Sequence, residues 1–290
     1  MEISYFKSAW SDIKHTPNWL SKMMKLALLN LIPIFGQIVT FGYLYGWARD
    51  IAWGVHQPLP DRIFSNEDGK LYRRGFFALV VAFVISLLPE LISLLGDFLT
   101  GGGALGVGMG STAAYARHSV WGSVMLVAGA LIQLLAIVAS FTAYVLTPVG
   151  IVRMAIYDRL SAGLQIGRIW KMLRHDPHGA LRIVGMTVLA GLVATFVVGA
   201  IGTLIASMCA VSFYAATGAG VVGASGAGSE LLYGFGGLSV VLLLALAYLA
   251  IVLAVWVNSL TIRAVGYWVF QFDVPDWRGQ DDPMPFEQSV

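Results

Sequence analysis

Residues 238–260 read LSVVLLLALAYLAIVLAVWVNSL, an apolar run without a charged residue. As a helix it would be about 35 Å long, enough to cross the roughly 30 Å hydrocarbon core of a bilayer. Three further runs are nearly as apolar, at residues 76–99, 120–145 and 183–211. We therefore predict an all-α fold, a polytopic membrane helical bundle with four full spans in a single domain covering residues 1–290.

The composition agrees with a membrane protein. Of the 290 residues, 58% are hydrophobic and 12% are charged, whereas a soluble domain usually has about 25% charged residues. The net charge of +2 gives no reason to expect a nucleic-acid partner. The single cysteine, Cys209, permits neither an internal disulfide nor a thiolate metal cluster.

Lysine and arginine are distributed unevenly between the spans. Of the 18, only Arg117 lies in a glycine-rich segment, and the others lie in residues 1–25, 46–75, 148–182 and 263–290. The positive-inside rule therefore predicts that these basic segments, including both termini, are on the cytoplasmic side of the plasma membrane. The glycine-rich segments 100–119 and 212–237 would then be outside.

A fifth apolar run, residues 26–45, is interrupted by Pro33 and Gly36. A single crossing would put the lysines of residues 1–25 outside, against the positive-inside rule. A re-entrant hairpin would keep every basic segment on one side, with arms of roughly ten residues, too short to span. Other helices would have to shelter its turn. We favour the hairpin and keep the single crossing as the alternative.

Two segments have the amphipathic pattern of helices that lie in the membrane surface. The apolar face of the first, in residues 1–25, consists of Ile3, Phe6, Trp10 and Ile13. The second has an apolar stripe of Ala162, Ile166, Ile169 and Leu173. We expect both to anchor the basic segments to anionic lipid in the bilayer. A docking surface for a membrane or cytoplasmic protein partner is the alternative.

One acid, Glu90, lies well inside a predicted span and directly follows Pro89. Charged groups at such depth default to functional candidates. We predict an intramembrane polar site of Glu90, Gln133 and Asn258, with Asp97 on the same helix face as Glu90. The alternative is that Glu90 is a neutral acid inside the bundle and that the two amides join helices by hydrogen bonds. No basic residue lies inside a predicted span.

Small residues recur every four positions in the third span. Small side chains allow a second helix to approach closely. We therefore predict a helix-packing seam, with the lining of a substrate path as the alternative, formed by Thr187, Gly191, Thr195, Gly199, Thr203 and Ser207.

Motifs for catalysis or cofactor binding are absent from the sequence. His175 and His178 are separated by a proline that prevents a regular helix, so we interpret this segment as a solvated loop. The glycine-rich residues 101–110 follow no strand, which argues against a nucleotide-binding loop. We therefore expect no metal, no cofactor and no enzymatic activity.

Residues 41–75 and their flanks carry a family resemblance. They contain Gly42-Tyr43, Arg49-Asp50, Pro58-Leu59-Pro60-Asp61, Asp68-Gly69 and Arg73-Arg74, between Leu31-Ile32-Pro33 and Leu87-Leu88-Pro89. This arrangement resembles the polytopic prokaryotic membrane proteins of domain-of-unknown-function family 4013. That family is distantly similar to the membrane domain of some glycerophosphodiester phosphodiesterases. The resemblance implies a membrane protein and supplies no chemistry.

These observations predict a multi-pass membrane protein that acts as a non-catalytic scaffold or accessory subunit. The alternative is a small transporter or permease component with Glu90 in a polar cavity, since broken helices often build substrate sites in transporters. An enzyme that acts on lipid is the third hypothesis.

Overall fold

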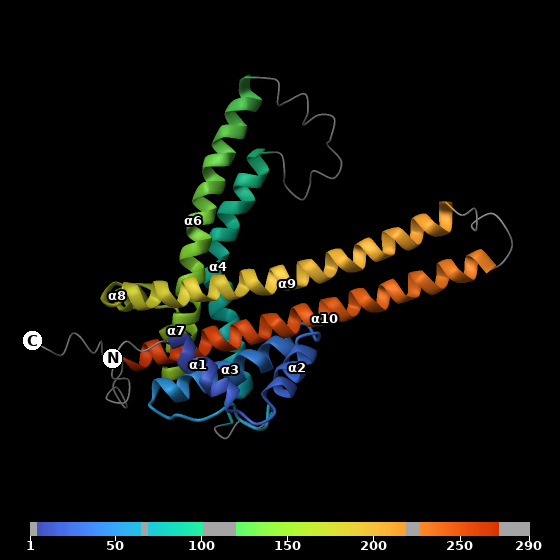
Figure 1. Ribbon diagram of the computed structural model, residues 1–290. Helices are drawn as coiled ribbons and strands as arrows, with labels where there is room; N and C mark the ends of the chain where they lie inside the picture. Colours follow the sequence, from blue (N-terminus) through green and yellow to red (C-terminus); the bar gives the residue numbers. More distant parts are fainter. Residues whose placement is uncertain (1–4, 65–68, 101–119, 219–226, 273–290) are drawn as a thin grey trace, which may run out of the picture.

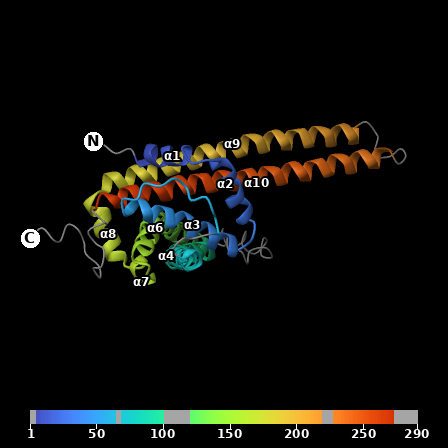
Figure 2. The ribbon, with the colours of Figure 1, turned by 90° about the horizontal axis from the view of Figure 1, so that it is seen from below.

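Two long helical hairpins dominate the computed structural model, which describes residues 5–64, 69–100, 120–218 and 227–272. One hairpin pairs α4 (Leu71–Thr100) with α6 (Val120–Tyr157), and the other pairs α9 (Pro177–Gly218) with α10 (Ala227–Phe270). The hairpins leave one end of the molecule in different directions (Figure 1). In Figure 2 the view runs along α4, whereas α9 and α10 extend across the picture.

The end shared by the two hairpins, which we call the base, is built from short helices. These are α1 (Tyr5–Lys14), α2 (Trp19–Leu29), α3 (Phe35–Ala52), α7 (Leu160–Gly163) and α8 (Ile166–His175). Twelve of the 18 residues of α3 are buried, because this helix packs against both α4 and α10. The described parts of the basic segments belong to these short helices or to the adjoining ends of the long ones, so they gather at the base (Figure 1). Their assignment to the cytoplasm stays a prediction.

The four predicted spans all fall inside the four long helices, and the all-α membrane bundle is confirmed. In the described part of the chain, these four helices are the ones long and apolar enough to cross a membrane. None of the most apolar stretch of α9 is buried inside the protein, so lipid has to cover it. With 44 residues, α10 is about 65 Å long, so the α9–α10 hairpin must tilt or extend beyond the hydrocarbon core.

The fifth apolar run turns back on itself and forms the α2–α3 hairpin. Its arms are longer than predicted, because α2 begins at Trp19 and α3 continues to Ala52. The reversal is a γ-turn: the Phe35 N–H donates to the Pro33 carbonyl at 2.6 Å, and Ile34 has a φ of 63°. Large apolar side chains are exposed at this tip, namely Leu28, Leu31, Ile32, Ile34 and Phe35. Insertion of the tip into the bilayer stays a prediction.

Helix α1, the first predicted surface helix, packs on the protein with one face. Tyr5, Ala9 and Ile13 are buried, and α1 contacts α10 and α9. Trp10 remains partly exposed, with its ring edge-to-face against Trp256 of α10. The buried face is therefore rotated from the predicted one, because α10 rather than lipid covers it.

The second predicted surface helix is divided into α7 and α8, since the helix is interrupted between Gly163 and Ile166. The buried face of α8 consists of Ile169, Met172 and Leu173. Ile166 and Trp170 are exposed, each by about half of its surface. The predicted stripe is therefore split between the protein interior and the outer surface.

Candidate functional site

A cavity of about 410 Å³ lies where the two hairpins diverge, and we call it the Glu90 cavity. Residues of α3, α4, α6, α8, α9 and α10 line it, and most of them are apolar. Side chains with a hydroxyl or amide group lie among them, namely Tyr45, Ser86, Ser140, Tyr144, Thr147, Thr187, Asn258 and Thr261. Glu90 alone of the lining residues is charged. The volume falls in the range of small-molecule sites.

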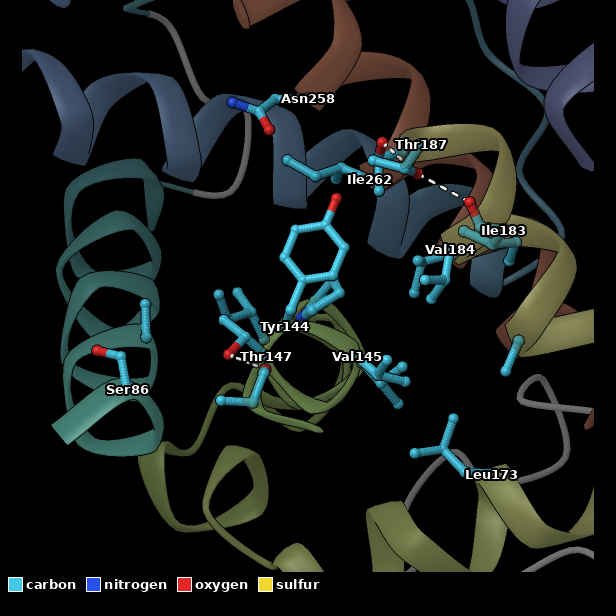
Figure 3. A pocket seen from close by; sticks show the side chains of 18 of the residues that line it. Ser86, Tyr144, Val145, Thr147, Leu173, Ile183, Val184, Thr187, Asn258 and Ile262 are labelled. Atoms are coloured by element: carbon cyan, nitrogen blue, oxygen red, sulfur yellow. Dashed lines mark hydrogen bonds between the residues drawn. The ribbon is translucent and has the colours of Figure 1, made fainter. Parts of the chain in front are cut away.

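The polar groups of this wall come from all four long helices, and Figure 3 shows Ser86 of α4, Tyr144 and Thr147 of α6, Thr187 of α9 and Asn258 of α10. Tyr144 reaches from α6 across the cavity, and its hydroxyl points toward Ile262 and Asn258 of α10. The hydroxyl oxygens of Thr187 and Thr261 are 2.9 Å apart and share a hydrogen bond between α9 and α10. The wall therefore offers hydrogen-bonding groups from both hairpins.

Two prolines in the cavity wall release further polar groups. Pro89 lies inside α4 and Pro148 inside α6, and both helices continue past them. A proline has no N–H, so the carbonyl four residues earlier loses its helix hydrogen bond. This carbonyl belongs to Ile85 in α4 and to Tyr144 in α6. The acid that follows Pro89 therefore lies beside a polar part of the backbone.

The structure brings together two of the three predicted polar residues. Glu90 and Asn258 line the same cavity, one from each hairpin, and both residues are exposed. Gln133 is elsewhere: its Nε2 donates to Ser93 Oγ at 3.2 Å, which joins α6 to α4. Asp97 is half-buried farther along α4 and is not in the cavity wall.

The predicted seam on α9 is found only at its beginning. Thr187 is buried and bonded to α10, Gly191 is half-buried, and the other four residues, Thr195, Gly199, Thr203 and Ser207, are exposed. A Cβ added at Gly191 or Gly199 would meet no atom within 4 Å. A four-residue step advances about 400° around a helix, so the stripe drifts by about 40° at each step and winds away from one contact.

Sequence reasoning missed three arginines that are almost fully buried in the base, Arg74, Arg153 and Arg263. Each lies within about two turns of a predicted span end. Arg153 Nη2 donates to Gln165 Oε1 at 3.1 Å. Arg263 Nη1 donates to the Trp47 carbonyl at 2.6 Å, and its guanidinium lies 4.2 Å from the Trp47 ring centroid.

A sequence signal for two of these arginines was present. Among the residues that the structure describes, four arginines are followed by an aromatic residue at the fourth position, in Arg49-Trp53, Arg73-Phe77, Arg153-Tyr157 and Arg263-Tyr267. In each pair the guanidinium lies between 5.1 and 6.0 Å from the ring centroid. Residues four apart are neighbours on a helix, and a guanidinium over an aromatic ring is attracted to it. The pattern marks helices that continue beyond the apolar runs.

Residues 25–203 match the family described as protein of unknown function (DUF4013). The chain belongs to this family. The DUF4013 match covers more than half of the chain and includes Glu90, whereas Asn258 and Arg263 lie beyond it. The predicted family is confirmed, and the similarity to glycerophosphodiester phosphodiesterase membrane domains stays a prediction. The comparisons with curated proteins and with solved structures gave no match.

Proposed function

We propose that this protein is a small membrane transporter or permease component, not an enzyme, whose substrate space is the Glu90 cavity. One observation carries the proposal: a single acid faces a wall that is otherwise uncharged and comes from both hairpins. A carboxylate at such depth is costly unless it meets a cation, a proton or water. The substrate class that fits is an amphipathic cation, with its apolar part against the wall.

The arrangement of the hairpins supports access to this cavity. The two helices of each hairpin pack on each other, and α10 also packs on the base helices α1, α2 and α3. The hairpins are joined through α3 and through the contact of α6 with α10. Movement of one hairpin against the other would therefore open or close the cavity while each pair stays intact. The kinks expected at Pro89 and Pro148 lie at the point where such movement would be needed.

Blocking the cavity tests this proposal. Ser86→Trp would fill it from α4, whereas Leu87→Trp adds the same bulk at an exposed neighbouring residue that is not in the wall. The probe is radiolabelled tetraphenylphosphonium, an amphipathic cation, and binding is measured on purified protein in a neutral detergent. We expect saturable binding that Ser86→Trp weakens at least about tenfold and Leu87→Trp leaves unchanged. Absence of saturable binding to the unaltered protein, or equal binding by both variants, would contradict the proposal.

A scaffold or accessory subunit is the second candidate, and the outer surface of α8 favours it. Ile166 and Trp170 are exposed there beside Arg168, Lys171 and Arg174. Such a surface fits anionic lipid headgroups or an acidic partner protein. Replacing Trp170 with Ala and both Arg168 and Lys171 with Gln should then release a co-purifying partner or reduce binding to anionic vesicles. Retention of both would leave this candidate without support.

A further inference from the structure

A groove of about 310 Å³ lies beside the Glu90 cavity, between α6, α8 and the start of α9, and we call it the α8 groove. Val145, Leu173, Ala180 and Val184 line both the groove and the cavity. Figure 3 shows Val145, Leu173 and Val184 around the same space, each from a different helix. This layer of apolar side chains therefore separates the groove from the Glu90 cavity.

The α8 groove has a buried floor and an exposed rim. In the floor, Leu146, Leu173 and Val184 are each at most 9% exposed. At the rim, Phe141 is 51% exposed and Leu181 is 63% exposed. An open groove with such a lining favours an occupant with an apolar part, because apolar surface on both sides is then removed from water.

The groove crosses the boundary between apolar and basic sequence. Phe141 belongs to the predicted span 120–145 and Val184 to the predicted span 183–211, whereas Arg174 belongs to the basic segment between them. At such a boundary the hydrocarbon core of a bilayer meets the headgroup layer. An occupant of the groove would therefore have its apolar part in the hydrocarbon core and its polar part near Arg174.

Two side chains of α8 form the polar end of the groove. Arg174 alone of the described lining residues is charged, and it is exposed. Trp170 lies one turn earlier and is 50% exposed, and tryptophan is enriched at the level of the headgroups. Asp176, the acid nearest to Arg174 in the sequence, accepts hydrogen bonds from the Gly179 N–H and from Trp268. Its carboxylate is therefore bonded to α9 and α10.

We infer that the α8 groove binds one anionic glycerophospholipid, with an acyl chain between α6 and α9 and the headgroup phosphate on Arg174. A guanidinium presents paired N–H donors that match phosphate oxygens, and such charge-assisted bonds are strong. Basic pockets between membrane-spanning helices on the cytoplasmic side bind anionic headgroups in this way. Phosphatidylcholine fits less well, because Arg174 would repel its trimethylammonium group.

The inference is independent of the transport proposal, since neither Glu90 nor Asn258 lines the groove. It also differs from a general attraction of lipid to the outer surface of α8. A charged surface attracts many lipid molecules weakly, whereas a groove with one polar end holds a single molecule and becomes saturated.

Native mass spectrometry of the purified full-length protein in a neutral detergent counts the lipid molecules that are bound. The probes are dioleoyl phosphatidylglycerol and dioleoyl phosphatidylcholine, which have the same acyl chains and differ in headgroup charge. We expect phosphatidylglycerol to saturate at one molecule per protein and to bind at least about tenfold more tightly than phosphatidylcholine. Equal affinity for the two lipids, or binding of phosphatidylglycerol that rises without saturation, would overturn the inference.

The headgroup end is tested by Arg174→Gln, which should fold normally because the residue is exposed. It should weaken binding of phosphatidylglycerol about tenfold. The matched control is Arg168→Gln, the same substitution on the same helix at a residue outside the groove wall, and it should bind normally. Equal weakening by the two variants would mean that the lipid responds to the charge of α8 as a whole, which contradicts a site at Arg174.

The acyl-chain end is tested by Leu181→Trp, which fills the groove from its exposed rim and should weaken binding of phosphatidylglycerol at least about tenfold. Leu189→Trp makes the same change at an exposed residue of α9 outside the groove wall, and it should bind normally. Unchanged affinity in Leu181→Trp would contradict an acyl chain in the groove. Release of a co-purifying protein by Leu181→Trp, with lipid binding unchanged, would assign the groove to a partner helix and also overturn the inference.

Discussion

Arg263 and Asp12 are separated by 251 residues in the chain, yet Arg263 Nη2 lies 2.6 Å from Asp12 Oδ2. The guanidinium side chain is completely buried, and the carboxylate side chain is 23% exposed. Tyr267 Oη also donates to Asp12 Oδ2, at 2.8 Å. This ion pair ties α1 to the part of α10 that lies in the base. Its partners come from opposite ends of the described chain, so it forms only when α1 packs on α10.

Removal of the charge on Asp12 should therefore destabilise the base. Asp12→Asn keeps the size of the side chain but leaves Arg263 buried without its counter-charge. Breaking a buried pair in this way typically costs 3–5 kcal/mol, and about 3 kcal/mol is expected because Asp12 is partly exposed. Thermal unfolding in detergent measures the effect, with the exposed Lys7→Gln as the control on the same helix. Equal melting temperatures for Asp12→Asn and Lys7→Gln would show that the pair contributes nothing.

Asp176 should make stability depend on pH. Burial raises its pKa. Hydrogen bonds from Gln271, the Gly179 N–H and Trp268, together with the charge of His178, lower the pKa by more than burial raises it, so the pKa of Asp176 lies below its ordinary value. A lowered folded-state pKa stabilises the fold above about pH 4, and this stabilisation is lost as pH falls through the folded pKa. Asp176→Asn should therefore cost about 1 kcal/mol at pH 7.

The test for Asp176 is a comparison of melting temperatures at two pH values. The gap between the unaltered protein and Asp176→Asn should be present at pH 7 and smaller at pH 3. A gap that is the same at both values would mean that the ionised carboxylate makes no difference to stability.

A side chain added at Gly202 should weaken the contact between α9 and α10, whereas a side chain added at Gly199 should not. A Cβ at Gly202 would lie 3.2 Å from Leu246 Cδ2 of α10, whereas a Cβ at Gly199 would meet nothing within 4 Å. Gly202→Leu should therefore lower stability by about 1–3 kcal/mol through overpacking, and Gly199→Leu should have little effect. Thermal unfolding in detergent measures the loss of stability in each variant. A larger loss for Gly199→Leu would restore the seam predicted from the sequence.

The long helices could be predicted because apolar length is a local property of the chain. Their ends could not, since α6 runs on to Tyr157 and α10 to Phe270, past Arg153 and Arg263. Those arginines are accommodated by partners on other helices, such as Gln165 and Asp12, which no apolar run reveals. Tertiary contacts with the base therefore extend helices that hydropathy alone would end.

The candidate sites were predictable to different degrees. Glu90 could be found because an acid in an apolar run is conspicuous in the sequence. Asn258 lines the same cavity as Glu90, whereas Gln133 does not. This difference depends on how the hairpins pack and could not be predicted from the sequence. That Arg49, Arg62 and Arg74 line one cavity could not be predicted, because in the sequence they look like ordinary basic residues of a segment between two apolar runs.

Accessibility to a membrane-impermeant thiol reagent should test which side of the membrane the base faces. After Cys209 is replaced by Ser, cysteines at Ser21 and Lys171 of the base should resist labelling in intact cells. Cysteines at Gly103 and Ser225, which lie outside the described residues, should be labelled. Labelling at position 21 but not at 171 would contradict a base that lies wholly on one side.

The most direct test of the account is the affinity of Glu90→Gln for tetraphenylphosphonium, measured beside Asp97→Asn. Both variants neutralise an acid of α4, but only Glu90 lines the cavity. A cation held by the carboxylate should bind Glu90→Gln at least about tenfold more weakly than the unaltered protein, whereas Asp97→Asn should bind normally. Equal affinity of Glu90→Gln and the unaltered protein would contradict a cation site at Glu90.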